Sequence, residues 1–284
     1  MDYVFVGDVH GKIKELKKIV KKYKGKDDVQ IVLVGDFLDG DVGSKPYETF
    51  LYIRKHKIKS IMGNHEQVWL DVLDGKENIK RFMGGYCRAL ATIMDFLEYC
   101  DNNRLEKIQP RQKYFDLAKY FAKEQNGRLQ SGTIIYDETV EAYPYLTPLT
   151  SCYYDFLVNR GGIKDYEIEK IAVLFQQIKD YVEDLPYIMQ FDGYVLSHAG
   201  YIGDDIKDVV KKEGPYVGKW PTPYPTKRWN GLIVVCGHIM AEIPLIYQDG
   251  ILQAIRLDAP RNTNELRYFD TKEQALHSVK VTNG

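Results

Sequence analysis

The amino-acid sequence predicts an α/β fold built on a parallel sheet, and three observations lead to this prediction. Short apolar runs alternate with helical patterns over the first sixty residues. Each of these runs ends in a glycine that is followed by a polar side chain, and two later apolar runs are each followed by a histidine. Strands that alternate with helices are typical of parallel sheets, which bind ligands at the carboxyl ends of their strands.

Five strand ends carry the polar motifs. Strands are predicted at residues 3–6, 31–34, 58–62, 193–197 and 232–237, because these runs are short, apolar and rich in β-branched residues. The motifs that follow them are, in chain order, Gly7-Asp8-Val9-His10-Gly11, Gly35-Asp36-Phe37-Leu38-Asp39-Gly40, Gly63-Asn64-His65-Glu66, His198-Ala199-Gly200 and His238. A glycine permits the tight turn that projects the next side chain from the strand end.

Helices are predicted between the first three strands. Residues 12–26 form an amphipathic pattern in which Ile13, Leu16, Val20 and Tyr23 share one stripe, surrounded by eight lysines. A solvated helix face is the commoner explanation of such lysines, and a surface that attracts phosphate or nucleic acid is the alternative. Residues 46–57 predict a second helix with proline in its first turn.

The middle of the chain changes character after Glu66. Residues 76–185 predict a mostly helical insertion that includes a helix at about 165–183. Residues 215–225 contain four prolines and predict an irregular loop ahead of His238. A hairpin is expected around Asp249-Gly250, and the tail from Asn262 predicts at most one further strand.

Composition excludes several classes of protein. The chain has 284 residues, 44% hydrophobic and 28% charged, which is ordinary for a globular protein with a sizeable core. The formal net charge of −1 gives no global attraction for nucleic acid, although a local patch stays open. No signal peptide or long apolar run is present in this sequence, so we expect a cytoplasmic protein without a membrane partner. The oligomeric state is not indicated.

The cysteines do not suggest a metal site. Cys87, Cys100, Cys152 and Cys236 are irregularly spaced without a CxxC pair, so we expect reduced thiols. The strand-end motifs instead offer two of their aspartates, one asparagine and three of their four imidazoles as candidate ligands. Oxygen and nitrogen ligands without sulfur suit two divalent transition metals held about 3.5–4 Å apart.

The order of the five motifs resembles the calcineurin-like metallophosphoesterase superfamily, specifically its phosphoprotein phosphatase branch of bacterial and phage type, which includes lambda phosphatase. The resemblance covers residues 2–75 and 185–258. It implies central β-sheets flanked by helices, in a single domain of residues 1–284 with the insertion at about 76–185.

The resemblance also implies a role for each motif residue. Asp8 and His10 would bind a first metal ion, Asp36 would bridge two ions, and Asn64, His198 and His238 would bind the second. Mn²⁺ is the first expectation for both sites, with Fe, Zn, Co or Ni as alternatives, because such ligands accept all of these metals. A metal-bridging water would attack phosphorus in line, since two cations lower its pKa.

His65 is expected to act as an acid rather than as a ligand. By resemblance it protonates the leaving oxygen, and Asp39 supports it, because an alkoxide is a strong base that needs a proton near neutral pH. Glu66 receives no catalytic role and is expected to support its neighbours.

Four positions bear on substrate choice. Gly40 stands where family members usually have arginine, and Met240 stands where diesterase relatives often have a second histidine. Arg228 is the nearest arginine before His238, and both a phosphate clamp and a solvated side chain are open for it. Arg88 of the insertion is an alternative source of such a clamp.

The sequence therefore predicts a dinuclear phosphomonoesterase, with serine/threonine protein phosphatase as the first candidate and phosphorylated proteins or small phosphoesters as substrates. A nucleotide or nucleic-acid phosphoesterase is the alternative enzyme, for example a diadenosine tetraphosphate hydrolase, a phosphodiesterase or an RNA-end phosphatase. A catalytically silent binding module is the alternative from another class. The complete set of predicted metal ligands argues against a catalytically silent module.

Overall fold

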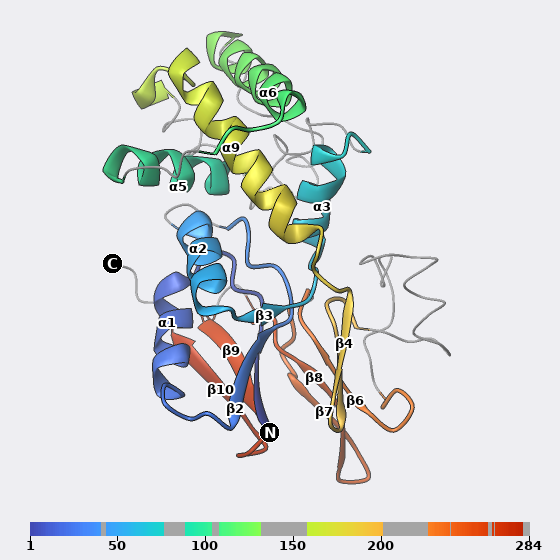
Figure 1. The fold of residues 1–284 in the computed structure, drawn as a ribbon. Coiled ribbons are helices and arrows are strands. Elements are labelled where there is room, and N and C mark those ends of the chain that lie inside the picture. The colour runs from blue at the N-terminus through green and yellow to red at the C-terminus, as the bar shows by residue number, and fades with distance from the viewer. Residues whose placement is uncertain are drawn as a thin grey trace. The chain divides into compact units, whose positions relative to one another are not determined.

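The structure, a computed structural model, confirms the α/β fold class (Figure 1). It describes residues 1–40, 44–76, 89–103, 108–131, 158–200, 227–238, 240–260, 263 and 265–280. The proline-rich loop at residues 215–225 lies outside the described residues, as does Arg88.

The first sheet has the strand order β10-β9-β1-β2-β3. Its parallel part joins β1 (Asp2–Val6) to β2 (Val29–Leu33) and β2 to β3 (Lys59–Ser60). On the other side of β1 lie two antiparallel strands, β9 (Glu265–Asp270) and β10 (Ala275–Lys280). The prediction of at most one strand in the tail is therefore wrong, because two strands complete this sheet.

The second sheet has the order β4-β5-β6-β8-β7. Its centre is parallel and consists of β5 (Tyr194–Ser197), β6 (Ile233–Cys236) and β8 (Ile251–Arg256). Antiparallel strands, β4 (Ile188–Phe191) and β7 (Leu245–Gln248), form its two edges. The expected hairpin is present, since β7 and β8 flank Asp249-Gly250.

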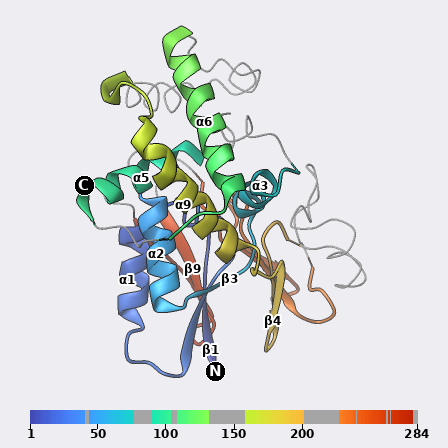
Figure 2. The ribbon, with the colours of Figure 1, turned by 45° about the horizontal axis from the view of Figure 1, so that its top comes forward.

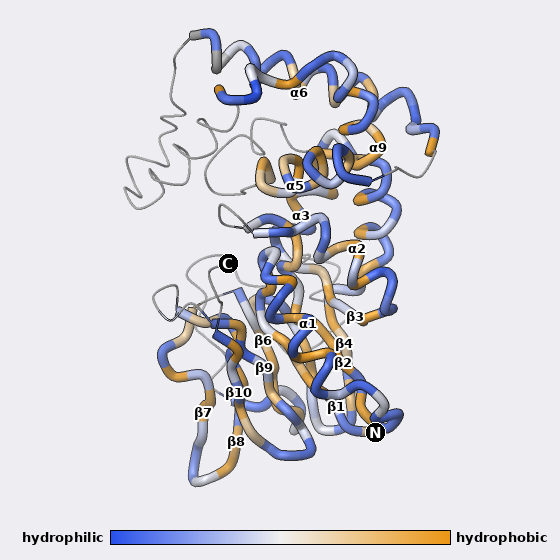
Figure 3. Tube along the Cα trace, turned by 90° about the vertical axis from the view of Figure 1, so that its left-hand side faces the viewer, coloured by the Kyte–Doolittle hydropathy of each residue, from blue (hydrophilic) through white to orange (hydrophobic). Residues whose placement is uncertain are grey.

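The core is shared by the two sheets. Phe5 and Val32 of the first sheet belong to the same buried cluster as Leu196, Val235 and Ile255 of the second. Hydrophobic residues appear in orange along these strands in Figure 3. Burial of this apolar surface fixes the strands that carry the polar motifs at their ends.

Six helices are described: α1 (Ile13–Lys22), α2 (Pro46–His56), α3 (Asn64–Leu73), α5 (Ala89–Asn102), α6 (Gln112–Ser131) and α9 (Asp165–Val182). In α1 the buried stripe consists of Ile13, Leu16 and Ile19, with Tyr23 buried just beyond, so Ile19 takes the place expected for Val20. Figure 2 shows α1 and α2 beside the first sheet.

The chain divides into two compact units. The first unit contains residues 1–37, 49–67 and 185–284, and the second contains residues 38–48 and 68–184. The second unit includes α5, α6 and α9, where Phe175 of α9 packs against Phe121 of α6. These helices fall within the range predicted for the insertion, and the single-domain assignment stays a prediction. Among the described residues, none of the helices has the length and apolar character that membrane crossing requires.

Candidate metal centre

The predicted ligands all belong to the first unit, where strand ends hold them. His10, Asp36 and His238 have φ values of 41°, 49° and 64°, in the left-handed region that side chains seldom adopt. Such backbone conformations cost about 1–3 kcal/mol each and cluster at functional sites. The strain therefore marks three of the five motifs as places where the surrounding sheets impose the side-chain direction.

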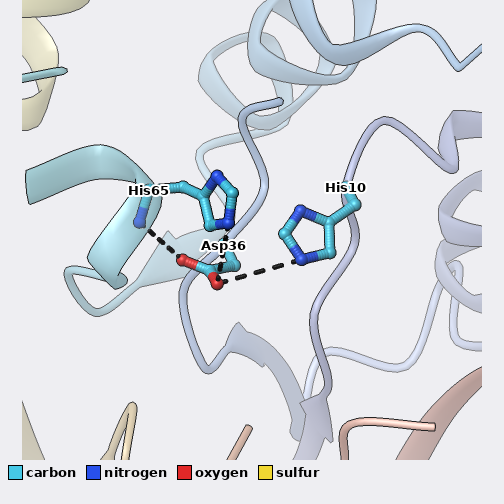
Figure 4. Close-up of side chains that lie close together, drawn as sticks. All are labelled: His10, Asp36 and His65. Atoms are coloured by element: carbon cyan, nitrogen blue, oxygen red, sulfur yellow. Dashed lines mark hydrogen bonds and ion pairs between the residues drawn. The ribbon is translucent and has the colours of Figure 1, made fainter. Parts of the chain in front are cut away.

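Asp36 lies at the centre of a histidine cluster (Figure 4). Its Oδ2 is 3.8 Å from Nε2 of His10, 4.0 Å from Nε2 of His65 and 3.2 Å from Nε2 of His198. Its Oδ1 accepts a hydrogen bond of 3.0 Å from the backbone N–H of His65. One carboxylate thus faces side chains from three other motifs, as a bridging ligand must.

Asn64 joins two further histidines. Its Oδ1 is 2.8 Å from Nε2 of His198 and 2.7 Å from Nδ1 of His238. The Nδ1–H of His198 donates to the carbonyl of Val34 at 2.8 Å, which aims Nε2 at Asn64 and Asp36. Histidine ligands usually anchor one ring nitrogen in this way and present the other to a metal.

Asp8 supplies an unpaired oxygen. Its Oδ2 accepts the backbone N–H of His238 at 2.8 Å. Its Oδ1 is buried and has no hydrogen-bond partner among the described residues. Because buried carboxylate oxygens are almost always satisfied, this atom indicates a missing positive partner.

Burial and neighbouring charges shift the pKa values of four side chains in the cluster. Burial, with the carboxylate of Asp258, raises the pKa of Asp8 well above its usual range. Burial alone would lower the pKa of His198, but Asp36 raises it to about 10. Burial also favours protonated Asp36, yet the imidazoles led by His198 lower its pKa well below the usual range. Burial and the neighbouring His198 lower the pKa of His238 to about 4.

Two groups of ligand atoms therefore share Asp36. One consists of His10, Asp36 and His65, the other of Asp36, His198 and His238, and within each group the atoms lie within 4.8 Å of one another. Together with the orphaned oxygen of Asp8, these imidazole, carboxylate and amide donors fit divalent transition metals. His65 lies in the first group, and its assignment as an acid rather than a ligand stays a prediction.

Glu66 supports the centre through the backbone. Its Oε2 accepts the N–H groups of Asp36 at 2.8 Å and Gly63 at 3.1 Å, and its Oε1 accepts the N–H of Phe37 at 3.0 Å. The side chain is fully buried. It therefore ties the second motif to the third, which agrees with the supporting role expected for it.

Asp39 is held inside the second unit. Its Oδ1 accepts hydrogen bonds from Nε1 of Trp69 at 2.9 Å and from Oγ1 of Thr92 at 2.8 Å, and it is fully buried. Thr92 could not be predicted as a partner of Asp39, because it lies 53 residues further along the chain. The pairing of Asp39 with His65 stays a prediction.

Arg228 precedes β6, and its contacts are with residues near the start of that strand. Its Nε donates to the carbonyl of Leu252 at 3.0 Å and its Nη1 to that of Gly231 at 3.3 Å. These residues lie before or beside the start of β6, whereas His238 follows the end of that strand. A phosphate clamp at Arg228 stays a prediction without structural support.

Arg267 is a positioning residue that sequence reasoning missed. Its Nη1 donates to the carbonyl of Ala241 at 2.6 Å, three residues after His238. Its own carbonyl accepts the N–H of Gly7 at 2.9 Å, next to Asp8. A buried residue of β9 thus holds the segments that carry two predicted ligands.

We expect Arg267→Met to weaken metal binding roughly 10–100-fold, as loss of a supporting contact around a metal ligand typically does. The methionine leaves the Ala241 carbonyl without its donor, so the segment after His238 loosens. Isothermal titration calorimetry with Mn²⁺ measures the effect. Leu266→Ala is the matched control, because it makes a cavity in the same strand without touching this contact. Equal affinities in Arg267→Met and the wild type would contradict the role.

Gly237 is required by the close approach of Asp8. A Cβ atom at this position would lie 1.9 Å from Oδ1 of Asp8 and 2.9 Å from Cγ2 of Val34. We expect Gly237→Ala to displace the carboxylate and to lower metal affinity at least about tenfold, with an overpacking cost of about 1–3 kcal/mol. Gly127→Ala in α6 has open space around its Cβ and should keep metal affinity while stabilising the helix by about 1 kcal/mol. Unchanged metal affinity in Gly237→Ala would show that Asp8 is not a ligand.

Comparison with known proteins decides the family. The sequence profile of calcineurin-like phosphoesterases matches residues 1–242. The chain belongs to this family. Members of this family are metal-dependent phosphoester hydrolases, and the superfamily resemblance that the sequence motifs indicated is confirmed.

Two similar proteins have more specific names. The chain is 33% identical over 67 residues to the zinc-dependent endopolyphosphatase of Saccharomyces cerevisiae (strain ATCC 204508 / S288c). The aligned segment covers 23% of this chain and 21% of that protein. The chain thus spans about a fifth of the length of this relative. It also aligns with the crystal structure of a "putative diadenosine tetraphosphatase" at 15% identity and a TM-score of 0.47, covering 100% of this chain and 95% of the other.

Proposed function

We propose that the metallophosphoesterase centre of this chain is dinuclear and that Asp36 bridges its two ions. The observation that carries the proposal is the position of the Asp36 carboxylate, which belongs to both groups of ligand atoms. Asp8 and His10 complete one site, and Asn64, His198 and His238 complete the other. Bound divalent ions in such a centre activate a water molecule and neutralise charge on the phosphoryl group.

The side chains around this centre divide the remaining work. The imidazole of His65, whose Nε2 lies 4.0 Å from Oδ2 of Asp36, holds a proton and passes it to the leaving oxygen. His198 and Glu66 keep the ligands aimed, since both are anchored to backbone groups. Mn²⁺ is the metal proposed from the sequence, and Zn²⁺ is the alternative because the curated relative is zinc-dependent.

Two substrate candidates are proposed. A serine/threonine protein phosphatase follows from the order of the motifs. Cleavage of polyphosphate chains is the second candidate, and the similarity to an endopolyphosphatase favours it. Both reactions displace an oxygen leaving group from phosphorus, so the same side chains serve either one. Nucleotides and nucleic acids are the alternative substrates that the sequence predicts.

The proposal is tested with metal-stripped protein and a panel of substrates. We expect no turnover in chelator and recovery with Mn²⁺ or Zn²⁺. A phosphoserine peptide, diadenosine tetraphosphate and long-chain polyphosphate, compared by kcat/KM, rank the candidates. Two bound ions per chain by elemental analysis support the dinuclear centre, and a single ion with full activity would overturn it.

Gly40 provides a test of substrate charge. In relatives the arginine at this position faces the phosphate, and a charge-assisted hydrogen bond contributes about 1.5–3 kcal/mol. We expect Gly40→Arg to shift the preference from bis-p-nitrophenyl phosphate toward p-nitrophenyl phosphate by roughly 10–100-fold in the ratio of kcat/KM. Gly127→Arg adds the same charge on α6 and should leave this ratio unchanged. A ratio that does not move in Gly40→Arg would show that another group already supplies the clamp.

A further inference from the structure

A high density of positive charge is found along α1 and the second half of α2 in the first unit. Residues 12–26 contain eight lysines and residues 49–59 contain four lysines or arginines, with Glu15 as the single acidic residue in both segments. The whole chain nevertheless has a net charge of −1, so the rest of it is strongly acidic. Glu15 is buried, and it does not offset the positive charge at the surface of α1.

These cations form one surface, which we call the basic face. It consists of exposed residues on α1, at the end of α2 and just beyond each helix, namely Lys14, Lys17, Lys18, Lys21, Lys24, Arg54, Lys55 and Lys57. The Nζ of Lys17 lies 5.5 Å from the ring centre of Tyr52, which joins the two helices. They lie side by side in Figures 1 and 2.

The basic face lacks the ion pairs of an ordinary solvated surface. In the described part of the chain, none of its eight residues forms an ion pair with a carboxylate. The neighbouring Lys22 is different, because it faces β10 and pairs with Glu273 at 3.8 Å. Like charges at such density repel one another, so the face gains free energy when a polyanion neutralises it.

The face begins beside the metal centre and extends away from it. α1 starts three residues after His10 and has ten residues, which is about 15 Å at 1.5 Å per residue. A single phosphate group at the metal centre cannot reach its far end. A chain of many phosphates can occupy the centre and the face together.

We propose that the basic face is a docking surface for inorganic polyphosphate chains whose scissile bond lies at the metal centre. This inference rests on the polyphosphate candidate for the function of the same site. Polyphosphate carries regularly spaced negative charges and has neither bases nor side chains. It therefore matches a surface whose exposed groups are mainly the ammonium and guanidinium groups of lysine and arginine. Binding of such chains depends steeply on salt, because each neutralised phosphate releases counterions.

The test reverses two charges in the middle of the face. In Lys17→Glu/Lys21→Glu, kcat/KM for long-chain polyphosphate is expected to fall roughly 10–100-fold, with a shallower dependence on salt. Hydrolysis of p-nitrophenyl phosphate should be unchanged, and the loss should grow with polyphosphate length from triphosphate upward. Lys119→Glu/Lys123→Glu is the matched control, because it makes the same change on exposed lysines four residues apart in α6.

A binding assay separates failure of this inference from failure of the proposed function. Fluorescently labelled long-chain polyphosphate is titrated in chelator against the wild type and the two double variants. Tight binding that only Lys17→Glu/Lys21→Glu weakens, without hydrolysis in metal, supports the docking surface and overturns the polyphosphate reaction. No binding, equal binding by all three proteins, or tighter binding of single-stranded RNA than of polyphosphate overturns the docking surface.

Discussion

Replacing Asp36 by asparagine is expected to abolish hydrolysis, with a loss of at least about 10³-fold. Asparagine has nearly the same shape, so the hydrogen bond from the His65 N–H to Oδ1 is retained. What disappears is the negative charge that faces three imidazoles at 3.2 to 4.0 Å. A loss of several kcal/mol in stabilisation of the transition state corresponds to about three powers of ten in rate.

Metal-dependent stability gives a readout of Asp36→Asn that does not require activity. A ligand that binds only the folded state stabilises it by about 2.7 kcal/mol at 100 times its Kd. The Tm of the wild type should therefore rise on addition of Mn²⁺, and the Tm of Asp36→Asn should not. Glu66→Gln is an informative comparison, because it perturbs the backbone hydrogen bonds around Asp36 and leaves the negative charge of the Asp36 carboxylate in place. A variant Asp36→Asn that binds two ions and turns over normally would refute the bridging role.

The clustering of the candidate ligands could be predicted from the sequence because each of them lies just after a predicted strand. Each ligand follows an apolar run, and the carboxyl ends of parallel strands meet at one edge of a sheet. Asp8 and Asp36 follow adjacent strands, β1 and β2, while His198 and His238 follow adjacent strands of the second sheet. A short apolar run followed by polar residues therefore indicated where these side chains lie, whereas the role of each one follows from the family resemblance and stays a prediction.

The supporting contacts could not be predicted because they depend on pairing between distant segments. β9 pairs with β1 across the length of the chain, with Phe269 opposite Phe5. Only this pairing brings Arg267 to the segment after His238. The local pattern of the tail contains a strand signal but no information about its partner, so the role of Arg267 was invisible.

Proximity in sequence does not by itself place Arg228 beside His238. It precedes His238 by ten residues, but the four-residue strand β6 lies between them. At about 3.3 Å per residue, such a strand separates what lies at its two ends by more than 10 Å. A residue close in sequence to a ligand is close in space only when no extended strand lies between.

Replacing His65 by alanine is expected to slow hydrolysis in proportion to the basicity of the leaving group. General acid catalysis contributes roughly 10²–10⁴-fold, and a poor leaving group needs the proton most. Phenyl phosphate should lose most of this factor, whereas an ester with a highly acidic leaving group should lose little. Metal binding should persist, because the backbone N–H that holds Asp36 Oδ1 remains in the variant.

The decisive measurement is kcat/KM of wild type and His65→Ala for a series of aryl phosphates, together with metal content. A steeper dependence of rate on leaving-group pKa in the variant confirms that His65 supplies the proton. His277→Ala is the matched control, because this histidine pairs with Glu273 at 2.7 Å on β10 and should leave the series unchanged. Equal losses for all esters, accompanied by loss of one ion, would instead assign His65 as a ligand of the first group. The geometry alone allows both roles, since its Nε2 lies 4.0 Å from Asp36 Oδ2, and only the leaving-group dependence separates them.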